Sequence, residues 1–142
     1  MTDAKAYLSQ VELYDTHINN KLEELQRLKE FTRQITSTWK KDVVATSGKQ
    51  DKLGEAIAKI IDLETEINDA IDAYIDRRRE VVSLIEKLNE PDQVLVLHKR
   101  YCEYKPWPQI AKEMHMAERT VQYTHGRALQ SVRLLLANGG AE

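Results

Sequence analysis

The first 90 residues contain no proline and only two glycines, Gly48 and Gly54, so little in them interrupts a helix. The chain of 142 residues has one cysteine, Cys102, which excludes an intrachain disulfide and favours a reducing compartment. No apolar run approaches the roughly 18 residues that span a bilayer, and no secretory signal is expected at the N-terminus. These absences predict a protein that works inside the cell that makes it and does not enter a membrane.

The chain also has no strong charge of one sign. It contains 21 Lys and Arg and 23 Asp and Glu, which gives a net charge of −2. The average conceals a division. Residues 1–90 hold 14 basic and 18 acidic side chains, whereas residues 91–141 hold 7 basic and 4 acidic ones. A mildly basic C-terminal part suits local contact with phosphate, although the overall balance is no strong electrostatic footprint of a nucleic-acid binder.

Apolar residues recur every seven positions through the proline-free stretch, which predicts coiled-coil packing of two long helices. In the second helix Arg77 is the exception to the repeat, and Ile57, Ile71 and Ile85 widen the apolar stripe. Since a hairpin buries one stripe of each helix, we expect self-association or a docked third helix. The rows are Val11, Ile18 and Leu25 with Tyr14, Leu28 and Ile35, then Leu53, Ile60, Ile67, Tyr74, Val81 and Leu88 with Ala56, Leu63, Ala70 and Leu84.

The stretch TSGKQD, residues 46–51, predicts a turn between the two helices, with Asp51 as the N-cap of the second. The simplest arrangement is an antiparallel hairpin over residues 4–89, with helices roughly 60 Å long. The run RRRE, residues 77–80, is either a basic patch for DNA or a partner, or a solvent-facing part of the helix. Charge runs on long helices usually face solvent, which favours the second interpretation.

Proline returns after residue 90 and divides the remainder into three shorter helices. Pro91 suits the first turn of a helix over residues 92–104, and Pro108 the first turn of one over residues 107–114. Residues 115–117 form the turn, and a third helix starts near Glu118. The core candidates are Val94, Leu95, Leu97, His98 and Tyr101 in the first helix, and Val121, Thr124 or His125, and Ala128 in the third.

The last two helices meet the steric demands of a helix-turn-helix, in which a small residue stands where the helices cross and apolar residues surround it. A corner that only packs would show the same inward residues, but has no reason for outward Arg, Gln and Tyr, which can reach base edges and phosphates. The predicted core is Ile110, Ala111, Met114, Met116 and Val121. The predicted DNA-binding residues are Glu118, Arg119, Thr120, Gln122, Tyr123 and Arg127.

The segment LHKRYCEYKPWPQIAKEMHMAERTVQYTHGRAL, residues 97–129, resembles region 4 of sigma factors, which reads the promoter −35 element. Together with DKLGEAIAKIIDLETEINDAID, residues 51–72, it resembles the phage-encoded late transcription regulators of the ArpU/RinA type. The resemblance implies an activator of phage late genes that acts with host RNA polymerase in the cytoplasm of a bacterial host. It places Glu118, Arg119, Gln122 and Tyr123 at bases and backbone, and Arg127 at a phosphate.

Three positions depart from the sigma-like pattern. Ala117 and Pro106 stand where Ser or Thr usually caps a helix, and the loss at Ala117 is worth about 1 kcal/mol. His115 stands at the turn glycine, so it must adopt a left-handed conformation or form a different turn. The outward set contains few arginines, which predicts modest and salt-dependent affinity of a single module.

The remaining side chains that could carry chemistry have simpler interpretations. His98 and Cys102 have a spacing that a metal can use, but no second pair accompanies them, so a packed pair is expected. His115 and His125 are interpreted as turn and DNA-proximal residues, and Trp107 as a core anchor. With no Gly-rich phosphate loop and no catalytic triad pattern, we expect no enzyme, cofactor or metal.

The sequence therefore predicts an all-α protein. Residues 1–90 form a long antiparallel helical hairpin for oligomerisation or partner binding, residues 91–137 a sigma-region-4-like DNA-binding helix-turn-helix, and residues 138–142 a disordered tail. Expected partners are double-stranded DNA, further copies of the chain as a homodimer or higher oligomer, and host RNA polymerase. Two alternatives stay open: a phage small terminase subunit, and an adaptor that binds RNA polymerase or a sigma factor without touching DNA.

Overall fold

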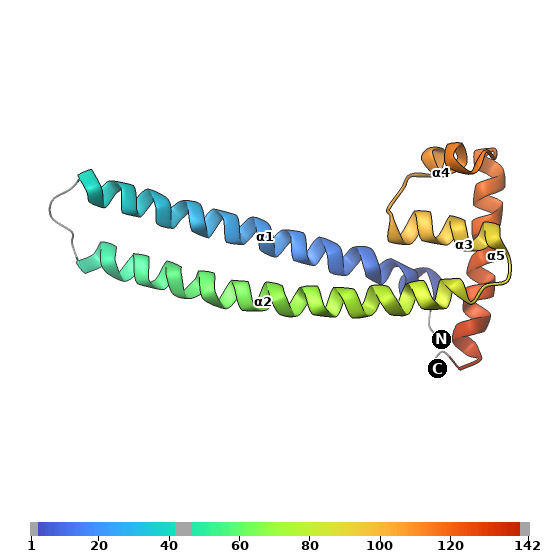
Figure 1. The fold of residues 1–142 in the computed structure, drawn as a ribbon, viewed down its shortest axis with the longest axis horizontal. Helices are drawn as coiled ribbons and strands as arrows, with labels where there is room; N and C mark the ends of the chain where they lie inside the picture. Colours follow the sequence, from blue (N-terminus) through green and yellow to red (C-terminus); the bar gives the residue numbers. More distant parts are fainter. Residues whose placement is uncertain (1–2, 42–46, 140–142) are drawn as a thin grey trace. The chain divides into compact units, whose positions relative to one another are not determined.

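The computed structural model describes residues 3–41 and 47–139, which are almost entirely helical and contain no strand (Figure 1). The predicted all-α class is therefore confirmed. Among the described helices, none combines a bilayer-spanning length with a sufficiently apolar composition. The helices are α1 (Ala4–Lys41), α2 (Ser47–Glu86), α3 (Pro91–Leu97), the π-helical turn η1 (His98–Cys102), α4 (Trp107–Met114) and α5 (Glu118–Ala137).

Internal contacts divide the chain into two compact units. The hairpin unit is Asp15–Ala73, and the C-terminal unit joins Met1–Tyr14 to Tyr74–Glu142. The start of α1 and the end of α2 thus belong to the same unit as the three shorter helices. The division at residue 90 stays a prediction, because compactness alone does not show which segments fold independently. Residues 140–142 of the predicted tail lie outside the described residues.

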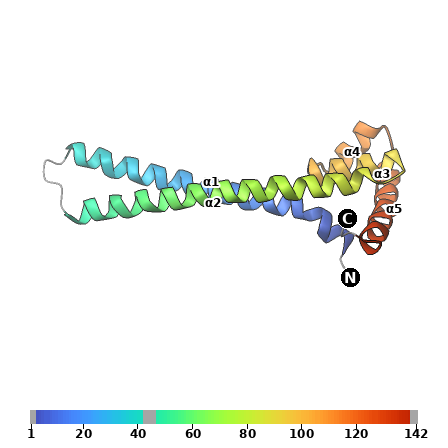
Figure 2. The same cartoon turned by 60° about the horizontal axis from the view of Figure 1, so that its bottom comes forward.

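In the hairpin unit, α1 and α2 lie side by side and run in opposite directions (Figures 1 and 2). Lys21 Nζ lies 3.0 Å from Glu66 Oε1, and Lys29 Nζ lies 3.8 Å from Glu64 Oε2. The residue number falls along α2 as it rises along α1, so the predicted antiparallel hairpin is confirmed within a single chain. Among the described side chains of this unit, the buried ones come from the predicted heptad rows: Ile18, Ala56, Leu63 and Ile67.

The beginning of α2 corrects the predicted turn. The helix starts at Ser47, so Asp51 lies in its second turn and is not its N-cap. The predicted loop is wrong over residues 47–51, whereas Thr46 lies outside the described residues. Gly48 costs about 1 kcal/mol in a helix, too little to end one whose next turn contributes Leu53 to the packed row.

The predicted widening of the apolar stripe is only partly correct. Ile85 is fully buried, but in the C-terminal unit, whereas Ile57 and Ile71 remain largely exposed. A helix in a two-helix hairpin can bury only the stripe that faces its partner, and these two isoleucines lie to one side of that stripe.

The C-terminal unit is built around one apolar cluster to which both long helices contribute. The first two turns of α1 and the last two turns of α2 pack against the end of α3, η1 and α5. The start of α1 and the end of α2 are therefore held together by the same apolar cluster. The buried members are Ala4, Leu8, Val11, Val81, Leu84, Ile85, Leu97, Tyr101, Cys102, Ala128 and Val132.

The predicted helix over residues 92–104 is only partly correct. Its core candidates Leu97 and Tyr101 are buried and Val94 packs against the apolar cluster, but the helical segment ends at Cys102. Leu95 is exposed, while Val96 and Gln93 are buried, and Gln93 Oε1 accepts a hydrogen bond of 3.1 Å from Ser131 Oγ. The chain then widens into the π-helical η1. This turn changes the phase of the helix and directs both Tyr101 and Cys102 into the core.

Arg77 departs from the solvent-facing interpretation of the RRRE run. Its Nη1 lies 2.8 Å from Glu80 Oε2, as expected of a helix surface, but its guanidinium carbon also lies 5.7 Å from the centre of the Tyr14 ring. The side chain is half-buried and fills a heptad position, since a guanidinium can pack flat on an aromatic face. Arg79 in the same run is exposed.

In the C-terminal unit, truncating a buried side chain should lower the free energy of unfolding much more than truncating an exposed one. Ile85→Ala should lower the free energy of unfolding by about 2–5 kcal/mol, because it leaves a cavity at a side chain with no exposed surface. Leu13→Ala, at a side chain that is 67 % exposed, should change it by about 0.5 kcal/mol or less. Urea unfolding followed by circular dichroism measures both, and equal losses would contradict this core.

Candidate nucleic-acid interface

The corner between α4 and α5 is formed by a left-handed residue. His115 has φ 55° and ψ 43°, which satisfies the first of the two conformations expected for it. Its N–H donates to Lys112 O at 3.3 Å, and the N–H of Met116 donates to Ala111 O at 3.0 Å. This pair of bonds is a Schellman motif, which satisfies the last carbonyls of α4 and folds Met116 back onto Ala111.

Both helices of the corner begin without a side-chain cap. Pro106 and Ala117 are extended residues with ψ of 156° and 146°, and neither provides a capping side chain. Their carbonyls accept the first helical bonds, from Ile110 at 3.1 Å and from Val121 at 3.0 Å. Glu118 lies in the first turn of α5, where a carboxylate interacts favourably with the helix dipole.

A small apolar cluster holds α4 against α5. Ile110 and Val121 have no exposed surface, and Ala111 is 7 % exposed where the helices meet. Val96 of α3 also belongs to the buried centre of this cluster, although the sequence pattern did not predict it. Trp107 packs at its edge, in the manner of the anchor expected there. The five residues of the predicted helix-turn-helix core, Ile110, Ala111, Met114, Met116 and Val121, all belong to this cluster.

The opposite face of α5 is open. In the part of the chain that the structure describes, neither Arg119 nor Arg127 takes part in an ion pair, although the Arg127 guanidinium lies 5.9 Å from the centre of the Tyr123 ring. The face is therefore polar, aromatic and weakly cationic. All six predicted DNA-binding residues are exposed along it: Glu118, Arg119, Thr120, Gln122, Tyr123 and Arg127.

A hollow of about 250 Å³ adjoins this face and limits where an anion can bind. Two carboxylates, those of Glu90 and Asp92, share its lining with Arg127. A phosphate that approached Arg127 from this side would be repelled by both carboxylates. Arg119, near the start of α5, is outside the hollow and is the better placed cation. The other lining residues are Gln93, Tyr123 and Thr124.

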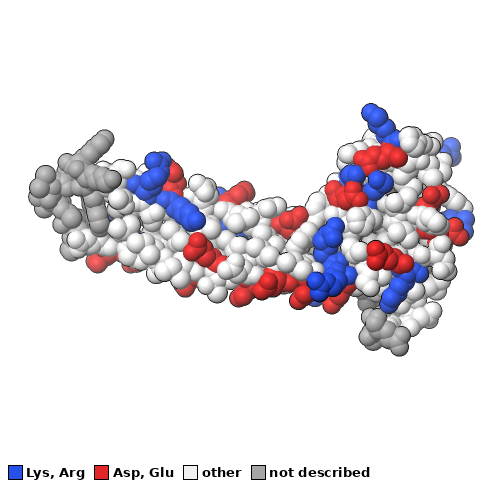
Figure 3. All heavy atoms as spheres, viewed as in Figure 1, with Lys and Arg blue, Asp and Glu red and all other residues white. Residues whose placement is uncertain are grey.

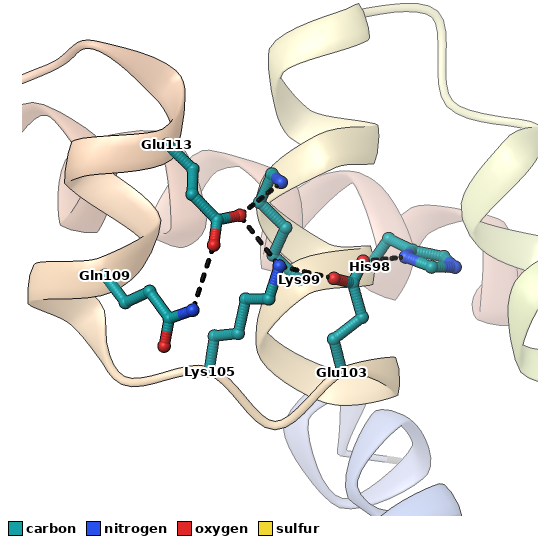
Figure 4. A network of polar contacts seen from close by, with 6 residues as sticks. All are labelled: His98, Lys99, Glu103, Lys105, Gln109 and Glu113. Atoms are coloured by element: carbon teal, nitrogen blue, oxygen red, sulfur yellow. Dashed lines mark hydrogen bonds and ion pairs between the residues drawn. The ribbon is translucent and has the colours of Figure 1, made fainter.

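A charged network joins η1 to α4 with Glu113 at its centre (Figure 4). Glu113 Oε1 lies 2.6 Å from Lys99 Nζ and 2.8 Å from Lys105 Nζ, and Oε2 accepts a bond of 3.0 Å from Gln109. These donors, Lys105 first, lower the pKa of Glu113 to about 2. The carboxylate is therefore ionised at neutral pH and ties α4 to the segment that precedes it.

Glu103 continues the network on its other side. Its Oε1 lies 2.7 Å from Lys105, which is the main cause of its lowered pKa, and its Oε2 accepts a bond of 2.6 Å from His98 Nδ1. Lys99 and Lys105 thus form ion pairs with carboxylates of their own chain. On the face drawn in Figure 3, basic and acidic side chains alternate, which agrees with this local pairing.

His125 packs as the core candidate that the sequence predicted, whereas its proximity to DNA stays a prediction. It is half-buried, with Nε2 2.7 Å from the Tyr101 hydroxyl and its ring centre 4.7 Å from that of Trp107. Burial lowers its pKa to about 4, with smaller contributions from Lys5 and Arg100. The Arg100 guanidinium lies 4.3 Å from the centre of the Trp107 ring. The rings therefore connect α5 to η1 and α4.

The helix-turn-helix and the segment before it match a known protein family. The family described as Sigma-70, region 4 matches residues 78–132, which are 55 of the 142 residues and run from the end of α2 into α5. No curated protein and no solved structure matches the chain. Residues 78–132 are thus sigma-70 region 4-like, and this likeness indicates a DNA-binding regulatory function.

The left-handed turn predicts an unusual order of stabilities at one position. His115→Gly should raise the free energy of unfolding by about 1 kcal/mol, because glycine adopts positive φ without a steric cost, whereas His115→Val should lower it by about 1–2 kcal/mol. Thermal and urea unfolding of the three proteins test the order Gly, His, Val. A glycine variant less stable than the valine variant would contradict the turn.

The lowered pKa of His125 predicts a dependence of stability on pH. Its folded pKa of about 4 lies below its ordinary value of 6.5, so the unfolded chain takes up the proton first as the pH falls. The free energy of unfolding should therefore decrease from pH 6.5 towards pH 4. His125→Gln should flatten this decrease between pH 6.5 and 5, whereas His17→Gln, at an exposed histidine, should leave it unchanged. Urea titrations at each pH provide the measurement, and an unaltered slope in His125→Gln would refute the assignment.

Proposed function

We propose that the protein is a sequence-specific DNA-binding transcriptional regulator that activates late genes of a bacteriophage together with the RNA polymerase of its bacterial host. The proposal rests on one observation above all: α5 presents exposed Arg119, Gln122 and Tyr123 on the face opposite a tightly packed helix-turn-helix core. The match of residues 78–132 to sigma-70 region 4 supports it, because that region combines DNA reading with polymerase contact.

In this proposal α5 is the recognition helix and enters the major groove with its first turns. Arg119 and Gln122 read base edges, since guanidinium and amide groups suit guanine and adenine there. Tyr123, Thr120 and Arg127 contact the backbone. The protein acts by binding alone, without catalysis or a cofactor, in the bacterial cytoplasm.

Self-association completes the proposed mechanism. Within its reading set a single module offers the cations Arg119 and Arg127, so its affinity for DNA is modest and decreases steeply with salt. Two modules carried by the long helices of one homodimer bind cooperatively to two half-sites. The same assembly brings a polymerase-contacting surface to the promoter.

The test is selection from a random duplex pool at near-physiological salt, followed by sequencing. The wild-type protein should recover a motif. Arg119→Ala and Gln122→Ala should each weaken binding to it by about 1–3 kcal/mol and relax one position of the motif. Arg133→Ala removes an exposed arginine of α5 outside the reading set and should preserve the motif.

Two outcomes would overturn the proposal. A motif that survives both Arg119→Ala and Gln122→Ala would show that α5 is not the reading helix. Recovery of no motif, with RNA polymerase retained on the immobilised protein, would favour the adaptor that binds polymerase without DNA.

A further inference from the structure

A second apolar seam runs along α2, beside the one that faces α1. Ile57, Ile61, Ile71 and Ile75 are 46 %, 58 %, 36 % and 45 % exposed. With the exposed polar residues at 64 and 68 they occupy positions 57, 61, 64, 68, 71 and 75, alternately four and three apart. This is the spacing by which one helix of a coiled coil meets another.

The seam has a definite beginning and end. Before Ile57, the same spacing reaches Gly54 and Gln50, which offer no apolar side chain. After Ile75 it reaches Arg78 and Val82, both half-buried, and Val82 already packs against the apolar cluster of the C-terminal unit. Four unpaired isoleucines are therefore confined to about 18 residues, or roughly 27 Å of helix.

The order of residue types in the seam is the same from either end: two isoleucines, two polar residues, two isoleucines. Its centre lies at the level of Glu66. A two-fold interface must be complementary to itself, so this order fits a second copy of the same helix. Antiparallel pairing about that centre aligns Ile57 with Ile75, Ile61 with Ile71 and Glu64 with Asn68.

The two polar residues at the centre of the seam, Glu64 and Asn68, favour antiparallel over parallel pairing of the two α2 helices. In-register parallel pairing would place the two Glu64 carboxylates against each other, and like charges at a helix contact are unfavourable. Antiparallel pairing places each carboxylate opposite the amide of Asn68, which can donate a hydrogen bond to it. Glu64 also keeps Lys29 of its own chain, 3.8 Å away, as a cationic partner.

We propose that this face is the interface of an antiparallel homodimer, in which α2 pairs with α2 of a second copy about a two-fold axis at the level of Glu66. The inference deepens the self-association within the proposed function, because it names the surface, the direction and the register. It does not depend on whether α5 reads DNA.

Disulfide trapping tests the register in a Cys102→Ala background. I61C and I71C, prepared separately and then mixed under mild oxidation, should give a cross-linked heterodimer. Neither should cross-link alone, because antiparallel pairing separates identical positions by ten residues, roughly 15 Å along the axis. L13C, at an exposed apolar position outside the seam, should cross-link neither with itself nor with I61C. Cross-linking of I61C with itself would overturn the antiparallel register.

Sedimentation equilibrium tests the interface itself. The wild-type protein should have the mass of a dimer, Ile61→Glu the mass of a monomer with its helix content retained, and Leu13→Glu the mass of a dimer. A monomeric wild type would overturn the inference, as would a dimeric Ile61→Glu. So would a monomer that retains RNA polymerase through Ile61, because the face would then bind a different protein.

These outcomes are independent of the proposed function. Arg119→Ala should remain a dimer. A dimer that selects no DNA motif would refute the DNA reading alone, whereas a monomer that selects one would refute the antiparallel dimer alone.

Discussion

The crossing of α4 and α5 depends on one backbone conformation, the left-handed turn at His115. The turn satisfies the carbonyls of Ala111 and Lys112 and returns Met116 to the surface of α4, so that a single small side chain separates the two helices. Val121 can then reach Ile110. Because the buried side of α5 is fixed in this way, its outward side is fixed too, and Arg119 and Gln122 face solvent as a consequence of the turn rather than of their own interactions.

Two lysines near the corner between α4 and α5 are paired with carboxylates of their own chain. Lys99 and Lys105 are held by Glu113 and Glu103, and these contacts position α4 instead of attracting phosphate. The arrangement agrees with a net charge of −2 in a chain whose C-terminal part is region 4-like. In the proposed function, non-specific attraction to DNA is correspondingly weak, so recognition would come from base contacts and from a second module or a polymerase that holds the protein at its site.

The sequence predicted those features that repeat or that one residue dictates. Heptad spacing predicted the helix pair, and the prolines at 106 and 108 delimited α4. The prediction of Asp51 as a helix cap failed because a polar stretch resembles a turn. The heptad row that begins at Leu53 instead favours a helix that starts earlier. Leu95 failed because Gln93, Val96 and Leu97, at i, i+3 and i+4, form the buried face of α3 and Leu95 lies off that face. The position of His125 depends on Tyr101 and Trp107, rings from two other segments, and such a contact exists only in the folded chain.

The two seams of α2 have different surroundings in a single chain. One seam is covered by α1 of the same chain, and the other has the composition of an interface with itself. The four isoleucines of the second seam stay partly exposed to water in the single chain, and burial of apolar surface is favourable by roughly 25 cal/mol per Å². The proposed antiparallel pairing therefore gains from this seam a stabilisation that the hairpin of one chain cannot provide.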